Sequence, residues 1–163
     1  MSSDPVSWTI FVLLLLVVLI SNGLVSASLN ALDYVDRNKL NDLREYEPNN
    51  RKAELIHDFI KKPSRYHYPD RIFMHSMAII AIVGFNFGFY AKLDSYRFLP
   101  VIANILFAIF YFALADIFPK KLAVQSADSY ALKLVRLQRF VCIVLFPITT
   151  LCLGVANLFL LIM

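Results

Sequence analysis

The feature that most constrains this chain is its first apolar run, because residues 5–32 contain no ionisable side chain. Residues 8–28 have the length that a helix needs to cross about 30 Å of hydrocarbon, and comparable runs follow at 72–91, 98–115 and 140–163. In lipid an unsatisfied backbone amide costs on the order of several kcal/mol, so we expect each crossing segment to be helical. The sequence therefore predicts an all-α membrane protein.

Composition agrees with a small membrane bundle. Hydrophobic residues make up 59% of the 163 and charged residues 17%, which leaves no room for a separate soluble catalytic domain. Cys142 and Cys152 both fall in the last apolar run. We interpret them as small packing residues rather than as a disulfide or metal pair.

The first run is either a cleaved secretory signal or a retained span. Val25, Ser26 and Ala27 look like a cleavage site, but the residues before the run include Asp4 and no lysine or arginine. A signal peptide has a basic start and a shorter apolar run. We therefore expect residues 8–28 to remain as a span.

Lysine and arginine are concentrated between the first two runs and after the third. Only Lys92 and Arg97 lie between the second and third runs, and none precedes the first. By the positive-inside rule, this distribution predicts an N-terminus outside and a cytoplasmic segment 33–71. We expect the plasma membrane, or the inner membrane of a bacterium.

Residues 33–65 predict a cytoplasmic juxtamembrane helical hairpin. Apolar positions recur with helical spacing on both sides of 47–50, where Glu-Pro-Asn-Asn interrupts the pattern. Acidic and basic residues nearly cancel there, which suits a solvated or headgroup-facing surface. We therefore expect contact with anionic lipid headgroups and no nucleic-acid partner.

The last run is compatible with two arrangements. It is long enough to cross the membrane, but Pro147 interrupts it, and Lys133, Arg136 and Arg139 recur every three residues before it. Such spacing places the three cations on one helical face, as in a helix resting among anionic headgroups. From the residues alone, the apolar continuation either crosses the bilayer or lies within the inner leaflet.

The sequence contains no nucleophile–base pair, phosphate-binding loop or metal-ligand cluster, so we expect no enzymatic activity. Polar groups inside the spans remain as candidates, because lipid makes them costly. Asp116 precedes Pro119, which disfavours the preceding helical turn and leaves carbonyl groups beside a carboxylate. That combination suits a hard cation, but Asp116 at the inner boundary is equally compatible with pairing to Lys120 or to water.

Other polar groups have both a ligand and a structural interpretation. Ser26 and Ser28 offer hydroxyl oxygens in the first span, although serines in spans more often bond their own backbone or a neighbouring helix. His75 is a metal-ligand candidate or an interfacial histidine. Asn86 and Asn104 predict an interhelical hydrogen bond. Small residues four apart, Gly84 with Gly88 and Gly23 with Ala27, predict close helix packing or a dimer.

The order of these pieces resembles the transmembrane domain of the CNNM/CorC family, which is linked to magnesium transport. The family's Phe-Phe-Ser-x-Ser-Glu-Thr-Ala-Leu pattern is similar to Leu-Val-Ser-Ala-Ser-Leu-Asn-Ala-Leu at 24–32. A Pro-Ser-Arg step stands at 63–65, and the family's Gly-Glu-Ile-x-Pro-Lys is similar to Ala-Asp-Ile-Phe-Pro-Lys at 115–120.

This resemblance implies a homodimer of one domain, with three transmembrane helices, a cytoplasmic hairpin, and a C-terminal belt helix at the inner leaflet. The C-terminus would then be cytoplasmic. The implied segments of the domain 1–163 are spans at about 8–28, 72–91 and 98–115, a hairpin at 33–65 and a belt helix at 126–163. The CBS pair that follows in the family lies outside this sequence, so the chain is either part of a longer protein or a stand-alone divergent member.

The resemblance also implies a Mg²⁺ site, with transport coupled to Na⁺ and no further cofactor. The ligands that match are Ser26 and Ser28, the backbone at Ala115, and the Asp116 carboxylate in place of a glutamate. For a transport function we add His75 and Ser76 of the second span as candidates. The second span departs from the family, because Phe-Met-His-Ser-Met-Ala at 73–78 replaces Gly-Asn-Asn-x-x-Asn.

Three functions remain open at this stage. The first is a divalent-cation transport module. The second is an accessory membrane subunit that lost the ion site and packs against other membrane proteins. The third keeps a metal site but recruits a softer ion through His75 and Met74.

Overall fold

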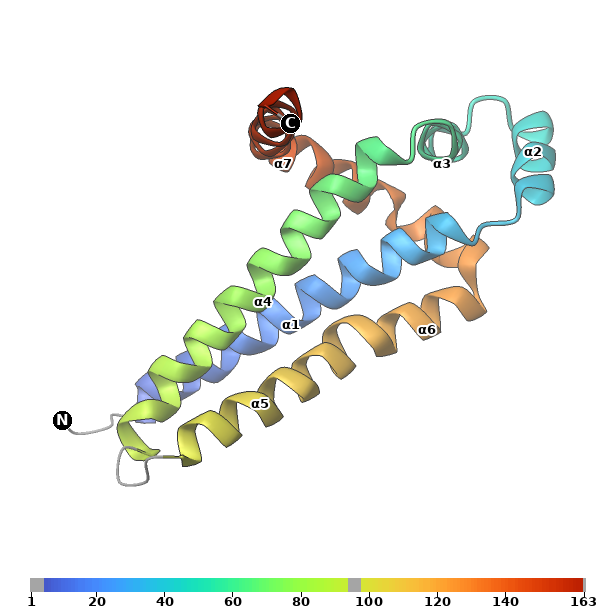
Figure 1. Ribbon diagram of the computed structural model, residues 1–163. Helices are drawn as coiled ribbons and strands as arrows, with labels where there is room; N and C mark the ends of the chain where they lie inside the picture. The colour runs from blue at the N-terminus through green and yellow to red at the C-terminus, as the bar shows by residue number, and fades with distance from the viewer. Residues whose placement is uncertain (1–4, 94–97, 163) are drawn as a thin grey trace.

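The computed structural model describes residues 5–93 and 98–162, and these are helical apart from short connections. Figure 1 shows α1, α4 and α5 running side by side, with η1 and α6 continuing the line of α5. The predicted all-α architecture is confirmed over the described residues. The elements are α1 (Pro5–Asp33), α2 (Arg37–Tyr46), α3 (Arg51–Lys61), α4 (Ser64–Leu93), α5 (Leu99–Phe112), the π-helix η1 (Ala113–Ile117), α6 (Phe118–Gln125) and α7 (Ala127–Ile162).

Two short capped helices, α2 and α3, form the segment between the first two long helices. The Asp36 side chain accepts from the Asn38 amide at the start of α2, and Asn50 accepts from the amides of Lys52 and Ala53 at the start of α3. These acceptors satisfy N–H groups that have no partner within the helix. The predicted break at 47–50 separates the two helices.

The main buried core lies where α1, α3, α4 and α7 meet. Leu32, Ile56 and Phe59 are almost fully buried there, together with Tyr66 and Cys142. Cys142 is therefore a packing residue, as predicted, whereas Cys152 is exposed, and both cysteines are free. The hairpin is attached to the bundle through this core.

Within the described residues, four helical segments are long and apolar enough to cross a membrane: Thr9–Asp33, Ser64–Phe87, Leu99–Gln125 and Ala127–Leu160. The chain is therefore a multi-pass membrane protein. All four extend beyond one end of the runs predicted from hydropathy: the first ends at Asp33, the second begins at Ser64, the third ends at Gln125 and the fourth begins at Ala127. Hydropathy marks the edge of the hydrocarbon, whereas a helix continues past that edge wherever its charged side chains reach water or headgroups.

The last helix has a different direction from the others. Figure 1 shows the final turns of α7 end-on, whereas α1, α4 and α5 lie along the plane of the view. Residues 150–160 are exposed along this part of α7, and Pro147 lies just before it. Pro147 removes a backbone donor and favours a change of direction.

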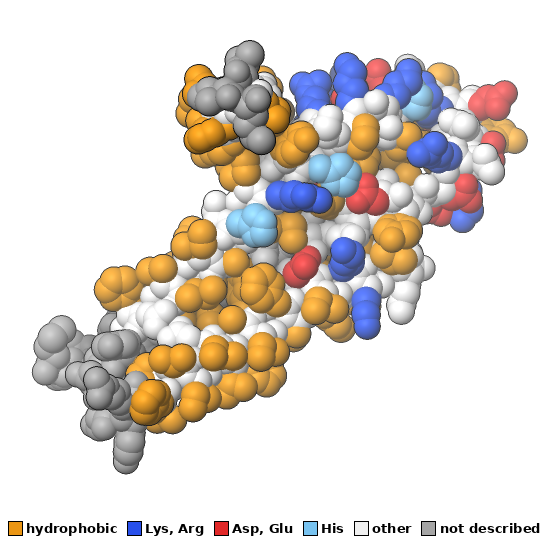
Figure 2. Space-filling model, in the orientation of Figure 1, with side chains coloured by type: hydrophobic (Ala, Val, Ile, Leu, Met, Phe, Trp, Pro, Cys, Tyr) orange, Lys and Arg blue, Asp and Glu red, His pale blue; other side chains and the backbone are white. Residues whose placement is uncertain are grey.

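Charged and apolar side chains are separated along the molecule. Figure 2 shows Lys and Arg gathered over the end that carries α2 and α3, and hydrophobic side chains covering the other end. The apolar side chains of Leu13, Val17, Ile105 and Ile109 are each about half exposed or more. An apolar surface of this kind is expected to contact lipid or another protein.

Candidate cation site

The continuous helix formed by α5, η1 and α6 changes its winding next to Asp116. The segment Ala113–Ile117 is a π-helix, and the amide of Phe118 donates to the Ala113 carbonyl. Pro119 has no N–H to give to the Ala115 carbonyl, so the regular ladder is interrupted here. π-helical turns of this kind are frequent at functional sites.

Ser26 of α1 contacts Asp116 directly, although the two lie 90 positions apart. The Ser26 hydroxyl donates to Asp116 Oδ1 at 2.6 Å and lies 3.3 Å from the Asp116 carbonyl oxygen. Ser26 is fully buried. A hydrogen bond to a carboxylate is stronger than one between neutral groups, so this contact joins α1 to η1.

Gly23 allows α1 to approach this segment closely. A β-carbon on Gly23 would lie 3.2 Å from Pro119 Cγ and 3.9 Å from the Ala115 carbonyl oxygen. Gly23 precedes Ser26 by about one helical turn, on the same face of α1. The absence of a side chain at Gly23 therefore helps to bring Ser26 within reach of Asp116.

Two further buried oxygens lie on the same helices. Asn22 is one turn before Ser26, and its side chain is the polar neighbour of the Tyr111 hydroxyl. Neither Asn22 Oδ1 nor the Tyr111 hydroxyl has a hydrogen-bond partner among the described residues. A bound water, or a hydrogen bond between these two neighbouring side chains, would satisfy both groups.

The structure brings together three of the predicted ligands and leaves three apart. Ser26, Ala115 and Asp116 form one group, with Ala115 fully buried. The Ser28 hydroxyl instead donates to the Leu134 carbonyl of α7 at 3.3 Å, because residues two apart differ by about 200° around a helix. His75 and Ser76 are exposed on α4 and are not part of this group.

The part of α4 that faces the group is apolar. Ala78 and Ala81 of α4 pack with Tyr111 and Ala115. Asp116 has no ion pair with Lys120 among the described residues. No group of three or more His, Cys, Asp or Glu capable of holding a metal occurs anywhere in residues 5–93 and 98–162. Any cation here would be held by one carboxylate and neutral oxygens.

Sequence reasoning missed Tyr111. It is 3% exposed, and its hydroxyl lies inside a span that has few other polar groups. That isolation was the available signal, because a polar group inside an apolar helix needs a partner. The interhelical bond predicted for Asn104 and Asn86 is confirmed, with a separation of 2.7 Å between Nδ2 of Asn104 and Oδ1 of Asn86.

Comparison with known proteins identifies a family. The family described as the Cyclin M transmembrane N-terminal domain, CNNM, matches residues 12–163. No curated protein and no solved structure matches the chain. The match covers nearly all of the sequence, including α1 with Ser26 and the η1–α6 segment with Asp116. The chain therefore belongs to the CNNM family and carries its transmembrane domain.

Proposed function

We propose that this chain is a transport module for divalent cations, with Mg²⁺ as the ion carried and Na⁺ as the coupling ion, and that it is not an enzyme. The observation that carries the proposal is the buried contact between Ser26 and Asp116 beside a π-helical turn. Its donors are oxygen atoms, which Mg²⁺ prefers to sulfur or imidazole. The unpartnered oxygens of Asn22 and Tyr111 support a polar path along the same helices.

We propose three transmembrane segments: α1, α4, and the continuous helix of α5, η1 and α6. α7 would then form a belt at the inner leaflet, with the N-terminus outside and the C-terminus in the cytoplasm. The direction of the end of α7 across the other helices supports this arrangement. The gathering of Lys and Arg at one end of the bundle supports the orientation.

An accessory role is the second candidate. It is favoured by the apolar packing of Ala78 and Ala81, which leaves α4 without an oxygen donor at the level of Asp116. In that role the exposed apolar faces would contact other membrane subunits. In the transport role a second copy of the chain would cover them, giving a homodimer.

The test is Mg²⁺ flux into liposomes that contain the purified protein and a trapped magnesium-sensitive dye, with and without a Na⁺ gradient. We expect Asp116→Asn to abolish flux and Ser26→Ala to reduce it. Ser76→Ala is the matched control, because Ser76 is exposed on α4, and it should behave as wild type. Folded wild-type protein that gives no more flux than empty liposomes would exclude transport by this chain alone and favour the accessory role.

A further inference from the structure

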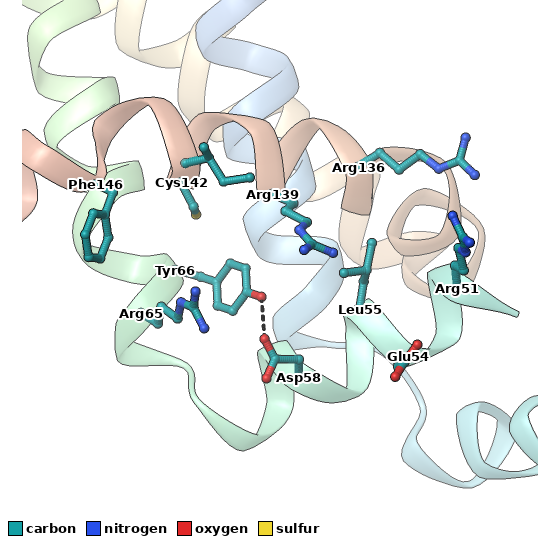
Figure 3. A pocket seen from close by; sticks show the side chains of 11 residues that line it. Arg51, Glu54, Leu55, Asp58, Arg65, Tyr66, Arg136, Arg139, Cys142 and Phe146 are labelled. Atoms are coloured by element: carbon teal, nitrogen blue, oxygen red, sulfur yellow. Dashed lines mark hydrogen bonds between the residues drawn. The ribbon is translucent and has the colours of Figure 1, made fainter.

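A cavity of about 980 Å³ lies between α3, the start of α4 and the middle of α7. Figure 3 shows Arg139 pointing from α7 toward Tyr66 and Asp58, with Arg65 beside Tyr66 and Phe146 at one end. None of its lining residues belongs to the group around Asp116. The cavity is therefore a separate site.

The cavity carries an excess of positive charge. Arg51, Arg65, Arg136 and Arg139 line it from three helices, against the two carboxylates Glu54 and Asp58. Asp58 already accepts a hydrogen bond from the Tyr66 hydroxyl at 2.9 Å. The two ion pairs within the described residues lie elsewhere, so none of these arginines is paired with a carboxylate there.

Unpaired guanidinium groups favour a phosphate ligand. A guanidinium presents a planar set of donors that matches two phosphate oxygens at once, which an ammonium group cannot do. The four arginines also come from elements that are distant in sequence, so the fold itself assembles them. A phosphate placed among them would satisfy donors that the described residues leave without an anionic partner.

The rest of the lining is apolar, and this distinguishes a lipid from a soluble anion. Leu55, Ile143 and Phe146 line the cavity, and Ile143 and Phe146 are each about 60% exposed, at 62% and 60%. From there the apolar surface continues along α7 through Leu151. A free phosphate would leave this surface uncovered, whereas an acyl chain would cover it.

We propose that this cavity binds one anionic phospholipid, with its phosphate between Arg65 and Arg139 and an acyl chain along Ile143 and Phe146. Basic pockets between helices on the cytoplasmic side are typical sites for anionic headgroups. The inference rests on the membrane topology proposed above but not on ion transport. Bound lipid would tie α3 and α4 to α7.

The test measures lipid binding by native mass spectrometry of the purified protein in detergent, with phosphatidylglycerol and phosphatidylcholine of equal chain length. We expect one phosphatidylglycerol per chain, held at least tenfold more tightly than phosphatidylcholine. The variant Arg65→Gln with Arg139→Gln should lose about tenfold or more in affinity, since each change removes charge-assisted hydrogen bonds. Arg37→Gln with Arg44→Gln, on exposed positions of α2, is the matched control and should keep wild-type binding.

Two further arms separate the sources of phosphate and guard against misfolding. Inorganic phosphate at millimolar concentration should not displace the lipid, and displacement would assign the site to a soluble anion. Phe146→Ser changes an exposed side chain and should weaken phosphatidylglycerol binding without altering the melting temperature. Equal retention of the two lipids, or wild-type affinity in the double glutamine variant, would overturn the proposal. These outcomes do not depend on Mg²⁺ flux.

Discussion

Asp70 of α4 and Gln138 of α7 form a fully buried polar pair, whose removal gives a quantitative prediction. The Gln138 side-chain amide donates to Asp70 Oδ2, and both residues are 0% exposed. Neither Asp70 Oδ1 nor Gln138 Oε1 has a partner among the described residues. The amide of Gln138 is therefore the donor on which the buried carboxyl depends.

Gln138→Leu removes that donor and puts an apolar side chain of similar size in its place. A buried polar group left without a partner costs about 1–3 kcal/mol. For a chain of this length, 1 kcal/mol corresponds to about 2–4 °C in melting temperature, so we expect a decrease of about 4–8 °C for a mid-range cost. Asp70→Asn should melt at or above wild type, because its amide both accepts from Gln138 and donates to Gln138 Oε1.

A thiol-reactive dye gives the assay, because unfolding exposes the buried Cys142. The measurement uses a Cys152→Ser background, since Cys152 is exposed in the folded protein. Gln125→Leu is the matched control at an exposed position and should leave the melting temperature unchanged. The double change Asp70→Leu with Gln138→Leu should be less destabilising than Gln138→Leu alone. A Gln138→Leu variant that melts within about 1 °C of wild type would refute this reasoning.

Three further predictions concern packing, capping and pH. Gly23→Val should lower the melting temperature by several degrees and weaken Mg²⁺ binding, because a β-carbon there already lies 3.2 Å from the ring of the facing proline. Gly154→Val has nothing within 4 Å and should be tolerated in the same melting assay. Asn50→Ala removes the cap of α3 and should cost about 1 kcal/mol, whereas Asn49→Ala should cost nothing measurable by thermal melting. The pKa of His57 is lowered from 6.5 by desolvation and by neighbouring cations, so stability should fall as pH drops below 6.5. Melting temperatures at pH 7.5 and 5.5 should differ less in His57→Gln than in wild type, and an unchanged difference would contradict that cause.

Hydropathy and turn chemistry predicted the long helices and the break at 47–50, because both depend on local sequence. The cost of polar groups in lipid singled out Ser26 and Asp116, the family resemblance agreed, and the fold brings the two together. Ser28 lies about 200° from Ser26 around α1, so helical periodicity alone places the two hydroxyls on different faces, whereas the motif contains both. The length of α7 is compatible both with crossing the bilayer and with lying at the inner leaflet. Only the direction of α7 relative to α4 bears on that choice.

Other features required the tertiary structure. Asp70 lies in the charged segment before the second apolar run, and Gln138 lies among the basic residues of α7, so neither stood out in the sequence. The arginine-lined cavity draws on three helices, and the spacing of Arg136 and Arg139 alone indicated only a basic face. Pairings of this kind depend on how helices pack, which local patterns do not encode.

The central claim is that Asp116 holds a hard cation beside Ser26, and calorimetric titration of Mg²⁺ into the purified protein tests it most directly. We predict saturable binding in wild type, abolished in Asp116→Asn and retained in Asp42→Asn, a matched change at an exposed position of α2. Absence of binding in folded wild-type protein, or equal binding in Asp116→Asn, would contradict the account.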